Sequence, residues 1–497
     1  MPRRLIVLLL AGSLLLIASS VSAGLTPLER LGKELFFDKI ASPDNMSCAS
    51  CHAPRAGWTG PIGGINAHGA VYRGAVPQRF GNRKPPSAGY ATPSPIFHYD
   101  ASEGLFVGGN FWDGRATGEH LGNPAADQAL GPFLNPVEQN NPSARAVLEQ
   151  VAASKYRRLW TEVWGMPVSF ATPADVNRDY DRIGLAIAAY EASAEVNQYS
   201  SKFDYHQRGM IELTPQEAWG LELFNGKGQC SACHAAPLFT DFTFDNLGVP
   251  KNPRNPFYDM DAVLLDDGQP INPEGEAWID LGLGGFLASL PAEYFTALGL
   301  DKATTVAENI GKHKVPTLRN VDLRPDMTFP KAYMHNGAFK SLKEVVHFYN
   351  TRDVGVWPAP EVAENVNTDE LGHLGLSDAE EDAIVAFMAT LSDGFVLPAQ
   401  EIAVSRAAAP QSARPDLLML ASEAGRYRLA YRVPAAGRAR MVVYDVGGRR
   451  VQTLLDDWRE PGAYALEWSA GGFASGLYFV RFDIGGTAQT RKVVVQR

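Results

Sequence analysis

The chain has 497 residues, of which 45% are hydrophobic and 20% are charged, and its formal net charge at pH 7 is −10. This composition excludes a disordered or fibrous protein, and the length predicts about two to four domains with well-filled cores. The negative charge argues against a surface that binds nucleic acid or an anionic membrane.

The first 23 residues have the three parts of a secretory signal peptide. Arg3 and Arg4 form a basic start, an apolar run extends from Leu5 to about Ala18, and small residues precede a cleavage point after Ala23. An uncleaved membrane anchor is the alternative, but the run is short for a bilayer span. We therefore expect an exported protein that is periplasmic, held at the cell surface or secreted, with no membrane span after cleavage.

Helices and long loops follow one another over residues 26–391. Residues 26–38 have the pattern of a short amphipathic helix with a proline in its first turn. Residues 57–141 are rich in Gly, Pro and Asn, which predicts long ordered loops around a large cofactor. Further helices are predicted from residues 143, 172 and 214, then an irregular acidic insertion over 250–293 and closing helices over 341–349 and 377–391.

All four cysteines lie in two copies of one pentapeptide, CASCH at residues 48–52 and CSACH at residues 230–234. A CxxC pair could form a disulfide, a redox couple or half of a zinc site, but zinc does not explain a histidine at the same offset in both copies. In CxxCH the two thiols can add to the vinyl groups of one haem, and the imidazole then lies under the iron. The sequence therefore predicts two covalent c-type haems, bound by Cys48, Cys51 and His52 and by Cys230, Cys233 and His234.

Each motif follows a predicted helix, so the two halves look like a distant internal duplication with one haem in each. After the signal peptide over residues 1–23, we expect a first haem domain over 24–205 and a second over 206–394. Residues 395–414 are rich in Ala, Pro and Ser, which predicts a linker. Residues 415–497 contain short alternating strands separated by Gly-rich turns, which predicts a small all-β sandwich without a catalytic role.

Six segments, in order along the chain, resemble the bacterial di-haem cytochrome c peroxidases and the related MauG enzymes. They are SCASCH, FWDGRA (residues 111–116), QALGPFLNPVE (128–138), CSACH, KVPTLRNV (314–321) and YMHNG (333–337). The resemblance covers about residues 25–391 and implies two mainly α-helical, class I cytochrome c-like domains. It also implies that the N-terminal haem reacts with hydrogen peroxide and that the C-terminal haem relays or stores oxidising equivalents.

The resemblance gives roles to four residues of the first half. Trp112 matches a tryptophan between the two haems, where an indole shortens a long electron transfer; without the resemblance it is equally a core residue. Gln128, Pro132 and Glu138 match the distal pocket of the peroxide-reactive haem, where the glutamate moves the proton that lets the O–O bond break. By its spacing alone, Glu138 would be a solvated loop residue.

Tyr349 stands where the peroxidases carry the axial methionine of the second haem, and MauG also has tyrosine there. Methionine raises the potential of a haem, whereas a tyrosinate is a hard anionic ligand that favours higher oxidation states of iron. The resemblance therefore implies a second haem that holds oxidising equivalents. If Tyr349 instead packs in the core, Met334 or His347 is the alternative ligand.

Two further positions concern metal ligands. His68 lies 16 residues after His52, where the classical peroxidases have a histidine that blocks the first haem until the enzyme is reduced. MauG-like enzymes lack that ligand, and a lone histidine in a polar loop is otherwise exposed. Asn82 matches an asparagine that helps to bind calcium between the haems. The partner stretch is here PKAY, in which Pro330 and Ala332 offer only carbonyl oxygens.

The C-terminal module resembles, as a pattern, the immunoglobulin-like sorting domains of type IX secretion and a similar domain of the flagellar hook-capping protein. The segments VYDVGGRRVQTL, PGAYALEWSA and SGLYFVRF carry this resemblance. It implies that the enzyme crosses the outer membrane or is held at the cell surface.

Two classes of function follow. The first is an enzyme that reduces hydrogen peroxide, either fed by a small electron-donor protein or acting as an oxidant of tryptophan residues in a partner protein. The second is a non-catalytic di-haem electron carrier with six ligands on both irons. Gln128, Pro132 and Glu138 favour the enzyme, because a carrier needs no acid above the haem.

Overall fold

The computed structural model describes residues 24–398, 400–402, 416–423, 426–445, 448–470, 472–473 and 476–495. The predicted signal peptide and most of the predicted linker lie outside these residues. Residues Leu25–Phe395 form one compact unit, and the chain from Val396 onward forms a second. Among the described helices, none combines the length and the apolar character that a membrane crossing requires.

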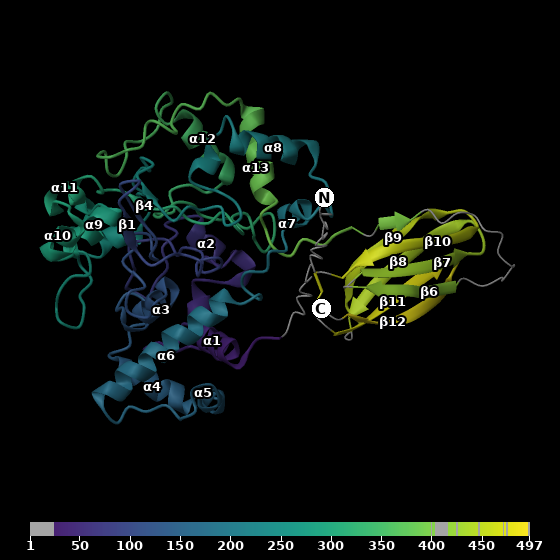
Figure 1. Cartoon of the computed structure of the whole chain (residues 1–497), viewed down its shortest axis with the longest axis horizontal. Helices are drawn as coiled ribbons and strands as arrows, with labels where there is room; N and C mark the ends of the chain where they lie inside the picture. Colours follow the sequence, from purple (N-terminus) through teal and green to yellow (C-terminus); the bar gives the residue numbers. More distant parts are fainter. Residues whose placement is uncertain are drawn as a thin grey trace, which may run out of the picture. The chain divides into compact units, whose positions relative to one another are not determined.

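The first part of the helical unit contains α1 (Pro27–Phe37), α2 (Gly63–Asn66), α3 (Pro124–Leu134), α4 (Ala144–Ala153), α5 (Arg157–Trp164) and α6 (Pro173–Ala192). Helices α1, α3, α4 and α6 each begin after a Thr, Asn or Ser whose side-chain oxygen accepts a backbone N–H of the first turn. Apart from α2, these helices gather at one end of the unit, around a core that includes Leu35, Trp160 and Ile183 (Figure 1).

Two sequence predictions for this part are wrong in detail. The segment predicted as one helix from residue 143 forms two, because Ser154 adopts an extended backbone (ψ 162°) and ends α4. The segment predicted as loops over residues 57–141 contains α3. That helix includes Gly131 and Pro132, residue types that disfavour a helix interior, so its sequence pattern does not reveal it.

The second part contains α7 (Lys202–Gln207), α8 (Pro215–Asn225), α12 (Leu342–Thr351) and α13 (Asp378–Ala389), which lie at the other end of the unit (Figure 1). They surround a separate core with Phe224, Phe239 and Phe387. Helix α9 (Gly282–Ser289) lies in the predicted insertion over residues 250–293, α10 (Ala292–Leu298) begins at its end, and α11 (Lys302–Ala307) follows it. Two small antiparallel ladders join β1 (His98–Asp100) to β2 (Leu105–Val107) and β3 (Phe244–Asp245) to β4 (His313–Lys314).

The same helix crossing occurs in both parts. A Cβ added at Gly32 of α1 would lie 1.8 Å from the carbonyl oxygen of Ala186 in α6. A Cβ added at Gly220 of α8 would lie 1.9 Å from the carbonyl oxygen of Ala383 in α13. Only glycine allows two helix backbones to approach so closely. The helix that precedes each CxxCH motif is therefore held in the same way, as an internal duplication predicts.

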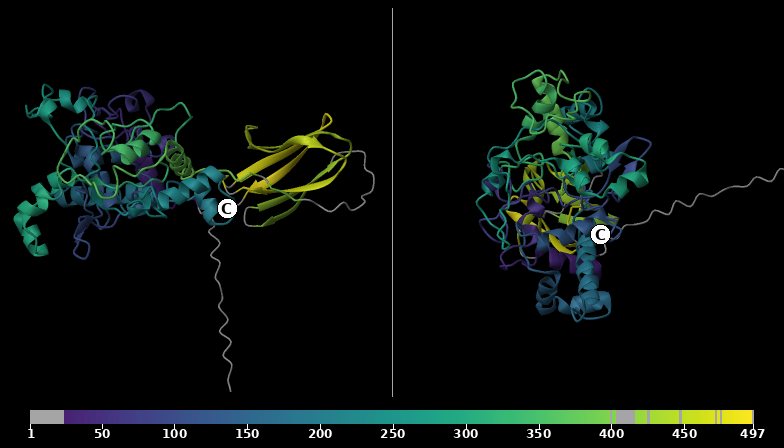
Figure 2. Two further views of the ribbon diagram at one scale, coloured as in Figure 1. Left: turned by 90° about the horizontal axis from the view of Figure 1, so that it is seen from above. Right: turned by 90° about the vertical axis from the view of Figure 1, so that its left-hand side faces the viewer.

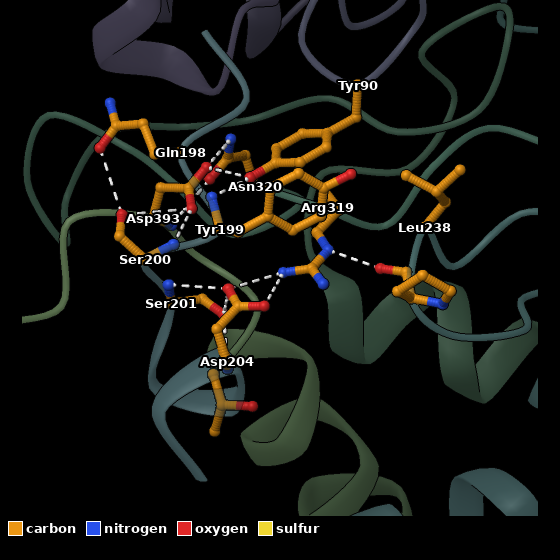
Figure 3. Close-up of polar contacts among 12 residues, drawn as sticks. Tyr90, Gln198, Tyr199, Ser200, Ser201, Asp204, Leu238, Arg319, Asn320 and Asp393 are labelled. Carbon is orange, nitrogen blue, oxygen red and sulfur yellow. Dashed lines mark hydrogen bonds and ion pairs between the residues drawn. The ribbon is translucent and has the colours of Figure 1, made fainter. Parts of the chain in front are cut away.

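A buried ion pair and its neighbours link the two parts (Figure 3). Arg319 Nη1 donates to both carboxylate oxygens of Asp204, at 2.9 and 2.8 Å, and its guanidinium lies 5.4 Å from the ring centre of Tyr90. The hydroxyl of Tyr90 donates to Asp393 at 2.8 Å, and Asp393 also accepts from the side chain of Asn320 at 3.0 Å. Because Tyr90 belongs to the first part, this network fixes residues 319–320 of the second part against it.

The unit from Val396 onward consists of two antiparallel four-stranded sheets, with strand orders β5-β10-β7-β6 and β12-β11-β8-β9. The strands are β5 (Gln400–Ile402), β6 (Asp416–Glu423), β7 (Arg426–Val433), β8 (Gly437–Asp445), β9 (Arg450–Arg459), β10 (Gly462–Ser469), β11 (Gly476–Ile484) and β12 (Thr487–Val495). Alternate residues of β11 are buried, and side chains of both sheets share one core. In that core the ring centres of Tyr431 and Phe482 lie 5.0 Å apart, and Figure 2 shows the strands as two layers.

Candidate haem sites

The first CxxCH motif lines a cavity in the first part of the helical unit. A short helical turn over Cys48–Ser50 leads to His52, whose backbone N–H donates to the Cys48 carbonyl at 2.9 Å. His52 Nδ1 lies 3.0 Å from the carbonyl oxygen of Pro86. A carbonyl accepts only from a protonated Nδ1, so the lone pair of the imidazole is on Nε2 and is available to a metal.

The second motif repeats this arrangement in a second cavity. A helical turn over Cys230–Ala232 leads to His234, whose N–H donates to the Cys230 carbonyl at 2.9 Å. His234 Nδ1 lies 2.9 Å from the carbonyl oxygen of Phe239. Both motifs therefore place a cysteine pair and an imidazole Nε2 lone pair beside a cavity of their own.

These donor groups fit two covalently bound haems. All four cysteines are free thiols, and burial raises the pKa of Cys48 and Cys230 to about 12. Burial lowers the pKa of His52 to about 4 and also lowers that of His234, so both imidazoles are neutral at pH 7. A histidine that ligates iron must have this neutral imidazole, and thioether attachment needs thiols that no disulfide has consumed.

The residues predicted for the peroxide pocket meet at the first cavity. Gln128 and Pro132 lie one turn apart on α3, and both line the cavity with Glu138. Glu138 lies in the loop after the helix, where its Oε2 accepts from Asn135 Nδ2 at 2.7 Å. Burial raises the pKa of Glu138, and the hydrogen bond from Asn135 opposes that rise. The cavity that contains His52 therefore also contains a carboxyl group that can give or take a proton.

One face of α12 lines the second cavity. The lining residues follow the i, i+3, i+4, i+7 spacing of a helix face: Leu342, Val345, Val346 and Tyr349. Tyr349 Oη lies 3.7 Å from Met334 Sδ, and both side chains line the cavity that contains His234. Burial raises the pKa of the Tyr349 phenol, so its coordination to a ferric iron would have to displace the proton.

His347, the other alternative ligand, points elsewhere. Its side chain is 52% exposed, its Nδ1 lies 2.9 Å from Glu381 Oε1, and it is not among the described residues that line either cavity. Met334 has a left-handed backbone (φ 68°), which is strained for a residue with a side chain. Strain of this kind persists where the surrounding structure fixes it, and Met334 lines the second cavity.

The two cavities share a wall. The residues that line both are Lys84, Pro86, Ser87, Trp112, Lys314, Val315, Pro316 and Thr317. Trp112 is 8% exposed, and its Nε1 donates to the carbonyl oxygen of Lys84 at 2.8 Å. The backbone N–H of Lys84 donates to the carbonyl of His335 at 2.8 Å. The indole of Trp112 is therefore fixed between the two cavities.

His68 and Asn82 have different surroundings. His68 is exposed, its Nδ1 lies 2.8 Å from the carbonyl oxygen of Gly64, and it does not occur among the described lining residues of either cavity. The structure thus does not bring His68 to the first haem motif. Asn82 lines the first cavity, and its backbone carbonyl accepts from Asn255 Nδ2 at 2.9 Å.

Glu191 also lines the first cavity, and its sequence position was not among the predicted site residues. Glu191 lies on α6 and is 4% exposed, and burial raises its pKa to about 8, so the carboxyl is mainly protonated at pH 7. A signal for it exists in the sequence. Ile183, Ile187 and Glu191 are four residues apart on one face of the helix, and an acid is out of place on that apolar face.

A second unanticipated group lies at the second cavity, where ligand atoms of Asp280, His313 and His335 are all within 4.8 Å of one another. The two imidazole rings stack with centres 3.6 Å apart and planes 9° apart. The lone pairs of parallel rings do not converge on one ion, and Arg83 already donates two hydrogen bonds of 2.6 Å to Asp280. We therefore assign no metal to this group.

Known proteins resemble the chain over most of its length. A model of the di-haem cytochrome c peroxidase family matches residues 27–212. The methylamine utilization protein MauG of Paracoccus denitrificans is 35% identical over 389 residues, which cover 74% of this chain and 88% of that protein. The cytochrome-c peroxidase IdrP2 of Denitromonas iodatirespirans is 28% identical over 379 residues, which cover 74% of this chain and 83% of IdrP2.

Solved structures agree with these relatives. The diheme peroxidase BthA of Burkholderia thailandensis has a TM-score of 0.58 at 28% identity and covers 75% of this chain and 87% of its own. A tyrosine-to-methionine variant of BthA has a TM-score of 0.59 at 28% identity and covers 74% of this chain and 86% of its own. The resemblance carried by the six sequence segments is thereby confirmed. The chain belongs to the di-haem cytochrome c peroxidase and MauG family of peroxide-dependent oxidoreductases, which implies two c-type haems.

Proposed function

We propose that hydrogen peroxide is reduced at the haem attached through Cys48 and Cys51, and that the haem attached through Cys230 and Cys233 receives and stores the oxidising equivalents. One observation carries this division of roles. Glu138 lines the cavity of the first motif with Gln128 and Pro132, whereas Tyr349 and Met334 line that of the second. A proton-transfer group therefore accompanies the first haem, and a candidate sixth ligand accompanies the second.

Bound haem supplies the iron at which peroxide is reduced, and the chain supplies the proton transfer. Glu138 takes the proton from the peroxide oxygen that approaches the site and returns it to the oxygen that departs. Asn135 donates to Glu138 Oε2, which holds the carboxyl in place and leaves its other oxygen for the substrate. The amide of Gln128 can orient peroxide, while Pro132 has no N–H and presents an apolar ring.

Electron transfer between the two sites then passes through the wall that they share. Trp112 is the aromatic residue of that wall, and its hydrogen bond to the Lys84 carbonyl holds the ring between the cavities. An indole at this place divides one long transfer into two shorter ones. This proposal gives Trp112 a role in transfer and none in the proton chemistry.

We further propose that Tyr349 is the sixth ligand of the second haem and that the enzyme oxidises a partner protein. If His234 and Tyr349 both held the iron, this haem would have no free position for a substrate, and a partner protein would be oxidised by electron transfer at a distance. A tyrosinate favours storage of oxidising equivalents over exchange of single electrons with a small donor protein. The relatives include both a MauG protein and cytochrome-c peroxidases, and the first of these supports the proposal.

For the C-terminal unit we propose an immunoglobulin-like sandwich that sorts the exported enzyme or anchors it at the cell surface. Its two facing four-stranded sheets and single shared core support this fold. Deletion of residues 415–497 should leave haem content and peroxide turnover unchanged and move the protein between periplasmic, surface and medium fractions. Loss of haem from the truncated protein would contradict a role limited to location.

Resonance Raman spectra of the ferric enzyme test the assignment of the haems. We expect one five-coordinate high-spin haem and one haem with tyrosinate bands, and we expect Tyr349→Phe to abolish those bands. Identical spectra of the two proteins would refute ligation by Tyr349. Two low-spin six-coordinate haems in the resting wild type would instead favour a non-catalytic electron carrier.

A further inference from the structure

A buried lysine beside the second cavity binds carbonyl oxygens of the chain itself. Lys331 is 4% exposed, and its Nζ donates to the carbonyl oxygens of Leu323 at 2.7 Å, Ala56 at 3.0 Å and Asn320 at 3.4 Å. An ammonium group has three N–H donors, so this arrangement uses all of them. Carbonyl oxygens are also the ligands that hard cations prefer. The ammonium of Lys331 thus occupies a site with the character of a cation site.

This carbonyl site joins the two parts of the helical unit. Ala56 lies in the turn that follows the first CxxCH motif, whereas Asn320 belongs to the second part. Gly57 has a left-handed backbone (φ 71°), and an added Cβ would lie 2.5 Å from the Asn320 carbonyl oxygen and 3.1 Å from Lys331 Nζ. Asn320 is also held through Asp393 in the network of Figure 3. The backbone is therefore built closely around the ammonium group.

A second buried lysine lies nearby. Lys84 is 7% exposed, lines both cavities, and donates from Nζ to the Pro85 carbonyl at 3.1 Å. Burial, and then the charge of Lys84, lower the pKa of Lys331 to about 7. The three carbonyl acceptors oppose this lowering of the pKa and favour the charged form of Lys331, because a neutral amine could donate to only two of them.

The calcium site suggested by the resemblance does not fit these surroundings. The carbonyl of Pro330 already accepts from Asn66 Nδ2 at 3.1 Å. Calcium takes about six to eight oxygen ligands, and carboxylates usually supply part of them. Lys84 follows Asn82 by two positions and Lys331 directly follows Pro330, so a divalent ion bound by these segments would be repelled by two buried ammonium groups.

We propose that Lys331, together with Lys84, is the resident cation between the two haem sites of this chain, and that no calcium ion is bound there. A calcium ion dissociates when its concentration falls, whereas an ammonium group on the chain cannot leave. The contact between the two parts, and the coupling of the two haems across it, would then be independent of the calcium concentration outside the cell.

The wild-type holoenzyme provides the first test. It is dialysed against calcium chloride, desalted and analysed for calcium by inductively coupled plasma mass spectrometry. We expect far less than one calcium ion per chain, and we expect EGTA to leave the absorption and EPR spectra of both ferric haems unchanged. One retained calcium ion per chain, with haem spectra that change on EGTA, would overturn the proposal even if no variant folds.

Lys331→Met tests the role of the ammonium group, because it keeps an unbranched side chain that is one atom shorter and removes the donors. We expect the melting temperature of the holoenzyme to fall by roughly 5 °C or more and the EPR signals of the haems to shift. Lys340→Met is the matched control, since Lys340 also donates to two carbonyls, those of His68 and Gly337 at 2.6 Å each, but is half-buried. Equal effects of the two substitutions would refute a special role for Lys331.

Discussion

The phenol oxygen of Tyr349 lies 3.7 Å from the sulfur of Met334, in the cavity that contains His234. Two side chains with opposite effects on a haem iron therefore lie side by side in the cavity of the second motif. A hard anionic oxygen lowers the potential of the haem, and a soft thioether raises it. Under the proposed function, ligation by Tyr349 favours storage of oxidising equivalents at the second site, whereas ligation by Met334 would favour the relay of single electrons.

Replacement of Tyr349 by methionine should raise the potential of one haem only. Axial ligands set haem potentials over roughly 0.8 V, and we expect a rise on the order of 100 mV or more for Tyr349→Met in a spectroelectrochemical titration. Met334→Leu is the control and should leave both potentials near those of the wild type. A large shift in Met334→Leu, with none in Tyr349→Met, would show that Met334 is the ligand.

Replacement of Glu138 by glutamine should slow the reaction with hydrogen peroxide by roughly 10²- to 10³-fold, because an amide cannot carry the proton. Stopped-flow mixing of the ferric enzyme with peroxide measures this rate directly. Glu191→Gln provides the comparison, since Glu191 is a buried carboxyl on the wall of the same cavity. We expect the rate of the peroxide reaction in Glu191→Gln to stay within a few-fold of the wild type. An equal loss of rate in both variants would contradict a specific role for Glu138.

The rate of the peroxide reaction should also depend on pH in a defined direction. In the proposed mechanism the carboxylate form of Glu138 is the base. Burial raises the pKa of Glu138, so this form appears at higher pH than for an exposed glutamate with a pKa of about 4.3. The second-order rate constant should therefore increase with pH and reach a plateau above the raised pKa. In Glu138→Gln the rate constant should no longer increase with pH. An increase that survives the substitution would show that another group titrates.

The crossing of α1 and α6 should be intolerant of any side chain at Gly32. An alanine Cβ would lie 1.8 Å from the Ala186 carbonyl oxygen, so the helices must separate, at a cost of about 1–3 kcal/mol in the free energy of unfolding. Chemical denaturation followed by circular dichroism measures the change. Gly64→Ala is the matched control, because nothing lies within 4 Å of a Cβ there, and a similar loss at Gly64 would contradict the steric explanation.

Local sequence signals predicted much of what the structure contains. The CxxCH turns and the capped starts of α1, α6, α8 and α13 depend on neighbours within a few residues, so spacing alone reveals them. The face of α12 that ends at Tyr349 follows from helical spacing once its N-cap at Ser341 is placed. Helix α3 was hidden because Gly131 and Pro132 break the pattern on which such predictions depend.

Other parts of the candidate sites could not be predicted because they depend on contacts between distant segments. The wall around Trp112 joins residues near 84 and near 314, and no local signal pairs them. The carbonyl site of Lys331 joins Ala56 to Leu323 in the same way. His68 illustrates the opposite case, since its spacing from the motif suggested a ligand, but the end of the short helix α2 carries it to the surface.

The paired glycine crossings give this chain an internal reference. Helix α1 meets α6 through the same kind of glycine contact by which α8 meets α13, so the two parts are two versions of one scaffold within the same chain. Both parts have the glycine at the helix crossing and an imidazole whose Nδ1 lies beside a carbonyl oxygen. We attribute these shared features to haem attachment. Glu138 lines only the first cavity and Tyr349 only the second, and under the proposed function these two residues give the two haems their different roles. Comparison of the two parts within this one sequence thus separates the scaffold that they share from the residues in which they differ.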